Sequence, residues 1–111
     1  MTVFKQIIDR EIPVKFIHED EHCVAFYDQN PQAPTHVLVI PRKEIPMLAD
    51  ATLDDAALLG HLLLTASQIA KSLALETGYR VVVNNGPDAC QSVYHLHVHL
   101  LGGRGFSWPP G

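Results

Sequence analysis

Three histidines occupy alternate positions in an apolar segment near the C-terminus, within residues Tyr94–Leu101. Side chains alternate between the two faces of a β-strand, so a strand would place His95, His97 and His99 on one face, roughly 6 to 7 Å apart. A helix would scatter the same rings around its axis. The spacing therefore predicts a strand that presents three imidazoles together and turns the intervening apolar side chains toward a core.

Three uses are open to such a set of imidazoles. The rings could simply satisfy hydrogen bonds in the interior, although three in strict alternation are costly to bury without a use. Neutral imidazoles on one strand face could also bind zinc. However, no HxxxH, CxxC or HxxE spacing lies near the segment, and no acidic partner is evident beside the strand. The third use is covalent catalysis at phosphorus.

Histidines can attack phosphorus without a large shift of their pKa values. An imidazole has an ordinary pKa of about 6.5, so it is largely neutral and nucleophilic near physiological pH. One ring could attack phosphorus while its neighbours stabilise charge on the phosphoryl oxygens, and water could displace that ring in a second step. Further donors are expected in the polar loop leading into the strand, where Asn84 and Ser92 lie.

Apolar periodicity predicts the elements that position this strand. A short helix is expected over residues 3–12, and a long helix is expected from an N-cap at Thr52 to a stop at Gly78. Four further strands are expected over residues 14–18, 22–28, 36–40 and 79–83. The order of helix, strands, long helix and strands predicts an α+β domain with a five-stranded antiparallel sheet, rather than alternating βαβ units.

Composition narrows the class of protein. The chain has 111 residues, of which 47% are hydrophobic and 18% charged, which predicts one folded domain. A net charge of −4 gives no basic stripe for nucleic acid, and no apolar run approaches the roughly 20 residues of a membrane span. Residues 1–10 do not resemble a signal peptide, so a cytoplasmic protein is expected, with Cys23 and Cys90 as unpaired thiols.

Several separated motifs carry a resemblance to a known family. The segment His95-Leu96-His97-Val98-His99-Leu100-Leu101 matches the pattern HxHxHφφ, in which φ is apolar. With Pro31-Gln32-Ala33-Pro34-Thr35-His36 and Gly102-Gly103, the chain resembles the nucleotide-binding-protein branch of the histidine triad (HIT) family over nearly its whole length. The resemblance implies the HIT-like fold in a single domain over residues 1–111, with an extended C-terminal tail from about residue 104.

The resemblance also implies an activity, namely hydrolysis of the P–N bond of purine nucleoside 5′-phosphoramidates to a nucleoside monophosphate and an amine, with no metal or cofactor. His97 would be the nucleophile that becomes nucleotidylated, and His99 would donate to a non-bridging oxygen. His95 and His36 would complete and orient the histidine cluster. The other implied contacts are Asn84 and Ser92 to the phosphate, Asp28 to the ribose hydroxyls, and an apolar base pocket formed by Phe4, Ile7, Ile12, Phe26 and Leu38, which could equally be ordinary core residues.

A homodimer is implied as well, with Leu64 and Trp108 at or near its interface. Cys90 departs from the glycine that close relatives commonly have, and Gln29 replaces a more usual apolar residue beside the ribose position. His18, His22 and His61 are predicted to be solvated surface residues. Two alternatives to the phosphoramidase remain, a zinc-dependent hydrolase and a non-catalytic module for nucleotide sensing or protein interaction.

Overall fold

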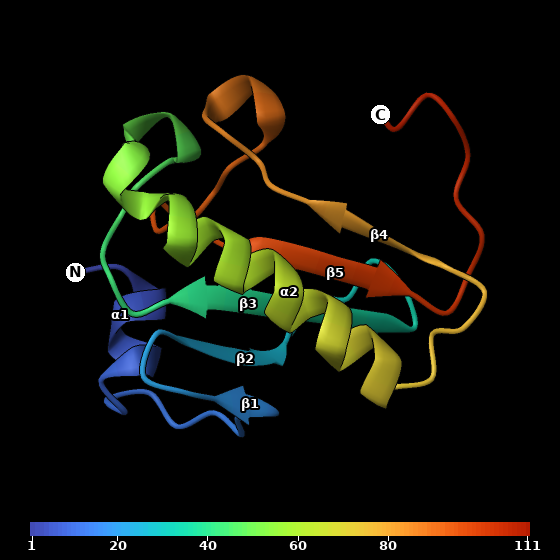
Figure 1. Cartoon of the computed structure of the whole chain (residues 1–111), viewed down its shortest axis with the longest axis horizontal. Helices are drawn as coiled ribbons and strands as arrows, with labels where there is room; N and C mark the ends of the chain where they lie inside the picture. The colour runs from blue at the N-terminus through green and yellow to red at the C-terminus, as the bar shows by residue number, and fades with distance from the viewer.

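The computed structural model describes all of residues 1–111. Its elements are α1 (Val3–Ile8), β1 (His18–Glu19), β2 (Cys23–Tyr27), β3 (Thr35–Pro41), α2 (Ala56–Ser72), β4 (Tyr79–Val82) and β5 (Val98–Gly102). The strands form one antiparallel sheet in the order β1-β2-β3-β5-β4, and α2 crosses one of its faces (Figure 1). The predicted α+β fold, with a five-stranded antiparallel sheet, one short N-terminal helix and one long central helix, is confirmed.

The register of the central strands decides which side chains share a face. Leu38 of β3 lies directly opposite His99 of β5, and directly opposed residues project to the same face of a sheet. His36 precedes Leu38 by two residues and therefore joins that face. Val39, one residue further along, lies opposite Val98 and projects to the other side. The sheet thus separates a face that carries histidines from one that packs under α2.

The helix α2 covers the second face over an apolar cluster. Twelve buried residues form this cluster: Cys23, Ala25, Val37, Val39, Ile45, Leu62, Ala66, Ile69, Ala70, Leu96, Val98 and Leu100. Thr52, predicted as the N-cap of the long helix, instead caps the short 3-10 turn Leu53–Asp55 that leads into α2: its hydroxyl accepts from the Asp54 backbone N–H at 3.3 Å, and its own N–H donates to the Asp55 carboxylate at 3.0 Å. Neither α1 nor α2 combines the length and apolarity that crossing a bilayer requires.

The helix α1 is shorter than predicted and packs on the histidine-bearing face. It ends at Ile8 because Arg10 takes a left-handed conformation, with φ of 61°, and donates its backbone N–H to the Ile7 carbonyl at 3.1 Å. Its apolar side joins a second cluster of seven buried residues: Phe4, Ile7, Ile8, Val24, Phe26, Leu38 and Ile40. The histidines therefore border a second, smaller core.

The histidine segment is only partly a strand, which corrects the prediction. β5 begins at Val98, opposite Val39, so His95 and His97 precede it. The ladder stops there because β3 ends at Pro41, which has no amide hydrogen to donate. The predicted alternation nevertheless persists, since the apolar residues between the histidines all lie in the cluster beneath α2. The strand expected over residues 14–18 is likewise reduced to the two residues of β1.

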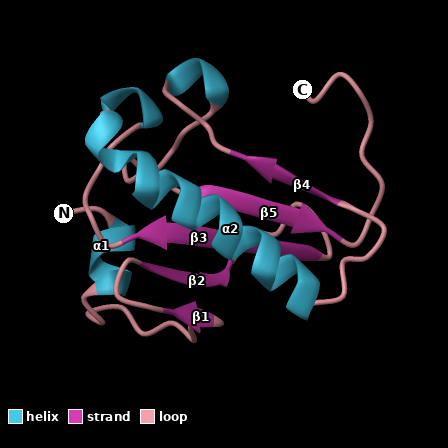
Figure 2. Cartoon of the chain, in the orientation of Figure 1, coloured by secondary structure: helices cyan, strands magenta, loops and turns pink.

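The chain beyond β5 has no regular secondary structure (Figure 2). The guanidinium groups of Arg104 and Arg80 stack on the Phe106 ring, 4.2 and 4.9 Å from its centroid. Arg80 also donates to the Ser107 carbonyl at 2.8 Å, and Arg104 Nε donates to the Gln32 carbonyl at 3.1 Å. These contacts hold the tail against β4 and against the loop that leads into β3.

Gly103 makes the turn out of β5, and its replacement is expected to destabilise the fold. Its φ of 86° lies in the left-handed region, and an added Cβ would lie 2.9 Å from the Pro34 Cβ. Gly103→Ala should therefore lower the free energy of unfolding by about 1–3 kcal/mol, measured by urea denaturation. Gly105→Ala is the matched control, because a Cβ there meets nothing within 4 Å. Equal stability of the two variants would contradict this account of the turn.

Candidate active site

The structure brings three of the four predicted catalytic histidines into direct contact. His36 comes from β3 and His99 from the neighbouring strand β5, and their ring centroids lie 5.2 Å apart. His97, just before β5, has its ring centroid 4.9 Å from that of His99. The edge of the Phe4 ring meets His97 at 4.9 Å between centroids, so α1 supports the ring of His97. His95 lies behind the cluster and is fully buried.

A chain of hydrogen bonds sets the proton positions on His36 and His99. The backbone N–H of Gln32 donates to His36 Nδ1 at 3.0 Å, so a neutral His36 carries its proton on Nε2. That Nε2–H donates to His99 Nδ1 at 2.9 Å. A neutral His99 must then carry its own proton on Nε2, which is buried and has no hydrogen-bond partner. Because buried donors are normally paired, this free N–H is a donor awaiting a ligand.

A second pair of contacts orients His97. Its Nδ1–H donates to the backbone carbonyl of His95 at 2.7 Å, which leaves the lone pair on Nε2. The His95 ring is anchored in turn, because its Nε2–H donates to the Pro41 carbonyl at the end of β3 at 2.8 Å. The backbone carbonyl of His95 therefore fixes the orientation of the His97 ring, with Nε2 left free.

The environment keeps all four rings neutral. Burial lowers the pKa of His36, His95 and His97 from the ordinary value of about 6.5, although Asp28 partly opposes the shift at His36. Burial, reinforced by the neighbouring rings of His97 and His36, lowers the pKa of His99 to about 4. Neutral rings at physiological pH supply one nucleophilic nitrogen and one N–H donor, the arrangement that attack on phosphorus needs.

Asp28 lies beside this cluster. Its Oδ2 is 3.5 Å from His36 Nε2, and its Oδ1 accepts from the Asn30 backbone N–H at 2.8 Å. The ligand atoms of Asp28, His36 and His99 all lie within 4.8 Å of one another, so these three residues could hold a metal ion. A metal there would have to replace the His36–His99 hydrogen bond, which already uses one nitrogen of each ring.

The predicted phosphate contacts lie on the segment that approaches the histidines. Asn84 follows β4 by two residues and is partly buried, and Ser92 is exposed ahead of the buried His95. No hydrogen bond joins either side chain to the four histidines. Gln91, which was not predicted, holds this loop, because its amide N–H groups donate to the Pro46 and Val93 carbonyls at 2.9 and 3.1 Å. A buried amide of this kind gives no signal in the sequence.

The predicted base-pocket residues fall into two groups. Ile7 and Ile12 line a cavity of about 180 Å³, together with Arg10, Pro13, Val14 and Phe16. Phe4, Phe26 and Leu38 are instead buried in the smaller core. Phe4 also contacts the ring of His97. A larger cavity of about 660 Å³ lies between residues 74–80 and 103–106 and contains none of the histidines. Of these two cavities, only the one of about 180 Å³ is lined by predicted base-pocket residues.

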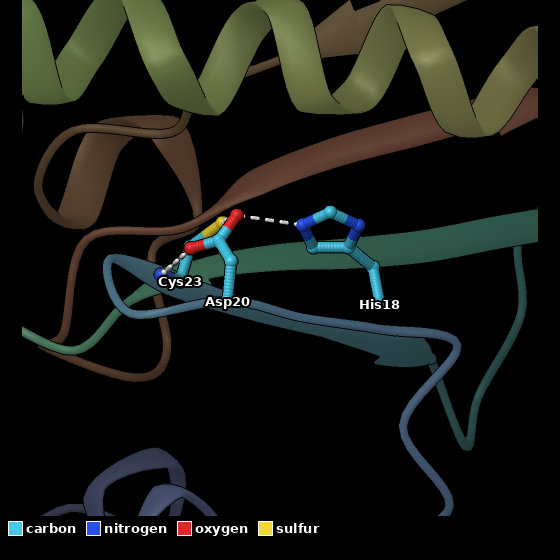
Figure 3. A group of neighbouring side chains, drawn as sticks. All are labelled: His18, Asp20 and Cys23. Atoms are coloured by element: carbon cyan, nitrogen blue, oxygen red, sulfur yellow. Dashed lines mark hydrogen bonds and ion pairs between the residues drawn. The ribbon is translucent and has the colours of Figure 1, made fainter.

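Two histidines expected to be solvated on the surface are instead partly exposed members of a polar network, so the structure corrects that prediction. His18 and His61 have side chains 29% and 37% exposed, and both rings contact Asp20 Oδ2, at 2.7 and 2.8 Å. Cys23 lies in the same group (Figure 3). The spacing His-x-Asp-x-x-Cys was the available signal in the sequence. His22 is more exposed, as predicted.

Comparison with known proteins agrees with this geometry. The HIT domain family model matches residues 9–106. An uncharacterised HIT-like protein of Synechocystis is 56% identical over 110 residues, or 99% of this chain and 96% of the relative. The 14 kDa zinc-binding protein of Zea mays is 54% identical over 112 residues, or 99% and 88%. The solved structure of a HIT family hydrolase from Legionella pneumophila superimposes with a TM-score of 0.97 at 46% identity, covering 100% of both chains. The chain therefore belongs to the HIT domain family.

Proposed function

We propose that this protein hydrolyses the P–N bond of purine nucleoside 5′-phosphoramidates through a nucleotidyl intermediate on His97. The observation that carries the proposal is the pairing of two unlike nitrogens in one buried cluster. His97 Nε2 has a free lone pair, and His99 Nε2 has a buried proton without a partner. A nucleophile beside an unpaired donor suits a phosphoryl group, which needs both attack and charge stabilisation.

In the first step, the lone pair of His97 Nε2 attacks phosphorus while the P–N bond to the amine breaks. The amine leaves with the bonding electrons and takes up a proton. The free N–H of His99 donates to a non-bridging oxygen, and His36 holds that ring in the required tautomer. In the second step, water attacks phosphorus, the bond to His97 breaks, and the ring recovers its lone pair. The water gives its second proton to solvent and the nucleoside monophosphate is released.

The substrate contacts are proposed from position. Asp28, half-buried beside His36, would accept the ribose hydroxyls, while Asn84 and Ser92 would reach the phosphate or the leaving group. Ile7 and Ile12, with the neighbouring Phe4, Phe26 and Leu38, would wall the purine.

We propose a cytoplasmic homodimer in which β4, one of the two edge strands of the sheet, pairs with its counterpart. Exposed apolar side chains on that strand, Tyr79 and Val81, and Leu64 on α2 support a covered surface there.

Incubation with adenosine 5′-phosphoramidate tests the proposal. Release of AMP is expected, and intact mass spectrometry of acid-quenched protein should show a transient increase by one nucleotidyl group. Activity is expected to survive EDTA. Activity that EDTA removes and zinc restores would instead favour a zinc-dependent hydrolase at Asp28, His36 and His99, whose ligand atoms lie close enough for a metal. Tight nucleotide binding without turnover of any phosphoramidate would favour a non-catalytic sensing module.

The pH dependence of kcat/KM reports the protonation of His97 in the free enzyme. Burial lowers its pKa below the ordinary value of about 6.5, so the nucleophile stays neutral as the pH falls through that value. We therefore expect kcat/KM to remain constant from about pH 8 to 6.5 and to decline only in more acidic solution. Rate measurements in constant ionic strength buffers check this. A decline centred above pH 6.5 would contradict the assignment.

A further inference from the structure

A second cluster of chemically capable side chains lies away from the catalytic histidines. It consists of His18 on β1, Asp20 in the turn after β1 and Cys23 at the start of β2, which Figure 3 shows, together with His61 on α2. His18 lies opposite Ala25, and Cys23 and Ala25 belong to the core beneath α2. This group therefore lies on the α2 side of the sheet, whereas His36 and His99 project from the other side.

Asp20 is the centre of the group. Its Oδ1 accepts from the backbone N–H groups of His22 and Cys23, at 2.7 and 2.8 Å, so the turn itself holds the carboxylate in place. Its Oδ2 then faces three side chains. His18 Nε2 is 2.7 Å away, His61 Nε2 is 2.8 Å away, and Cys23 Sγ is 3.5 Å away. The ligand atoms of His18, Asp20 and Cys23 thus all lie within 4.8 Å of one another, and His61 Nε2 contacts the same carboxylate oxygen.

We propose that His18, Asp20, Cys23 and His61 bind a zinc ion. Zinc takes four ligands drawn from thiolate sulfur, imidazole nitrogen and carboxylate oxygen, which is the set present here. The charges also balance, because one thiolate and one carboxylate neutralise Zn²⁺ while two neutral imidazoles complete the tetrahedron. Softer ligands of this mixed kind favour zinc over calcium or magnesium, which prefer oxygen alone.

The distances from Asp20 Oδ2 to the other three ligand atoms are close to those around a tetrahedral ion. Zinc bonds of about 2.1 Å to oxygen and nitrogen and about 2.3 Å to sulfur set tetrahedral edges of about 3.6 Å for O···S and 3.4 Å for O···N. The Asp20–Cys23 separation of 3.5 Å already fits. The ring nitrogens of His18 and His61 must withdraw from Asp20 by about 0.7 and 0.6 Å to admit the metal. Both rings are partly exposed, so they have room to move and leave a route for the ion.

Binding exchanges protons for the metal. The Cys23 thiol loses its proton to solvent, and each neutral ring shifts its proton from Nε2 to Nδ1 so that Nε2 can coordinate. The hydrogen-bonded network seen here and the metal-bound site are therefore two alternative states of the same four residues. In both states the turn between β1 and β2 is tied to α2, and zinc would strengthen that tie.

Zinc titration of chelator-treated full-length protein, in competition with a chromophoric chelator, tests the proposal. One zinc per chain is expected. His61→Ala and His18→Ala should each weaken binding by more than the roughly 10–100-fold that changes around metal ligands typically cost. His22→Ala is the matched control, because its ring lies beside His61 but only its backbone bonds to Asp20. Weakening in the control equal to that in His61→Ala would overturn the site.

Cobalt substitution reports the sulfur ligand directly. Co²⁺ should give a thiolate charge-transfer band that disappears in Cys23→Ser and persists in Cys90→Ser, which removes the exposed thiol. Substitution of the buried Cys23 can disturb folding, so a thermal shift supplies a second readout. Zinc should raise the Tm of the wild type but not that of His61→Ala, which changes a partly exposed side chain. Zinc binding that is unchanged in these variants but lost in His99→Ala would place the metal in the active site and overturn the proposal. Failure of the wild-type protein to bind zinc would also overturn it.

Discussion

His97→Ala is expected to lower turnover of adenosine 5′-phosphoramidate by about 10⁴-fold or more and to abolish the covalent adduct. Loss of a nucleophile in enzymes that act through covalent intermediates has effects of about this size, because the remaining groups can only bind and polarise the substrate. In this protein the remaining groups are the His99 donor and its support from His36. Steady-state AMP release and intact mass spectrometry measure the two effects separately.

Removal of the buried His97 ring could also disturb packing, so a second variant separates chemistry from folding. His97→Gln keeps a side-chain donor for the His95 carbonyl but has no nucleophilic nitrogen, and it should be as inactive as His97→Ala. His22→Ala removes an exposed ring and should retain full turnover. A nucleotidyl adduct on either His97 variant would show that another residue is the nucleophile.

Leu62→Ala is expected to have the largest effect on stability among single truncations on α2. Leu62 is fully buried in the cluster between α2 and the sheet. Truncation of such a side chain leaves a cavity and typically costs about 2–5 kcal/mol, against a total stability of about 5–15 kcal/mol for a domain of this kind. Urea denaturation followed by circular dichroism measures the loss.

Leu53→Ala is the matched control for this prediction. The substitution is the same, but the Leu53 side chain is 94% exposed in the turn that precedes α2. Its free energy of unfolding should stay within about 0.5 kcal/mol of the wild-type value. If both variants lost stability equally, burial under α2 would not be the reason for the effect of Leu62→Ala.

The sequence was most informative where local pattern and global fold agree. The alternation of histidine with Leu96, Val98 and Leu100 predicted which side chains face the core, and this holds although β5 begins only at Val98. The early end of the ladder depends on Pro41, a residue on another strand, so the histidine segment alone could not show it. The face to which a side chain projects follows from its position in the local sequence. The length over which two strands pair also depends on the residues of the partner strand.

Contacts between distant segments were the main information that the sequence lacked. On α2, the apolar Leu63 is 51% exposed while the polar Thr65 is buried, so residue type alone does not give the buried face. His61 was assigned to solvent because it lies on the polar side of that helix. Its partner Asp20 lies 41 residues earlier, and only the folded chain places the two side by side. The same holds for the proton positions on His36 and His99, which follow from the Gln32 backbone contact.

The alternation of faces in the central strands also has an evolutionary consequence. Neighbouring positions such as Leu38 and Val39 belong to different sides of the sheet, one beside the catalytic rings and the other beneath α2. Volume-conserving exchanges beneath α2 therefore change the stability of the protein and, with it, the amount of folded protein. The catalytic rate of each folded molecule is unchanged. Under the proposed function, exchanges beside α1 would act on substrate choice instead. A lineage of this fold can thus change its substrate without rebuilding the scaffold, and stabilise the scaffold without losing its chemistry.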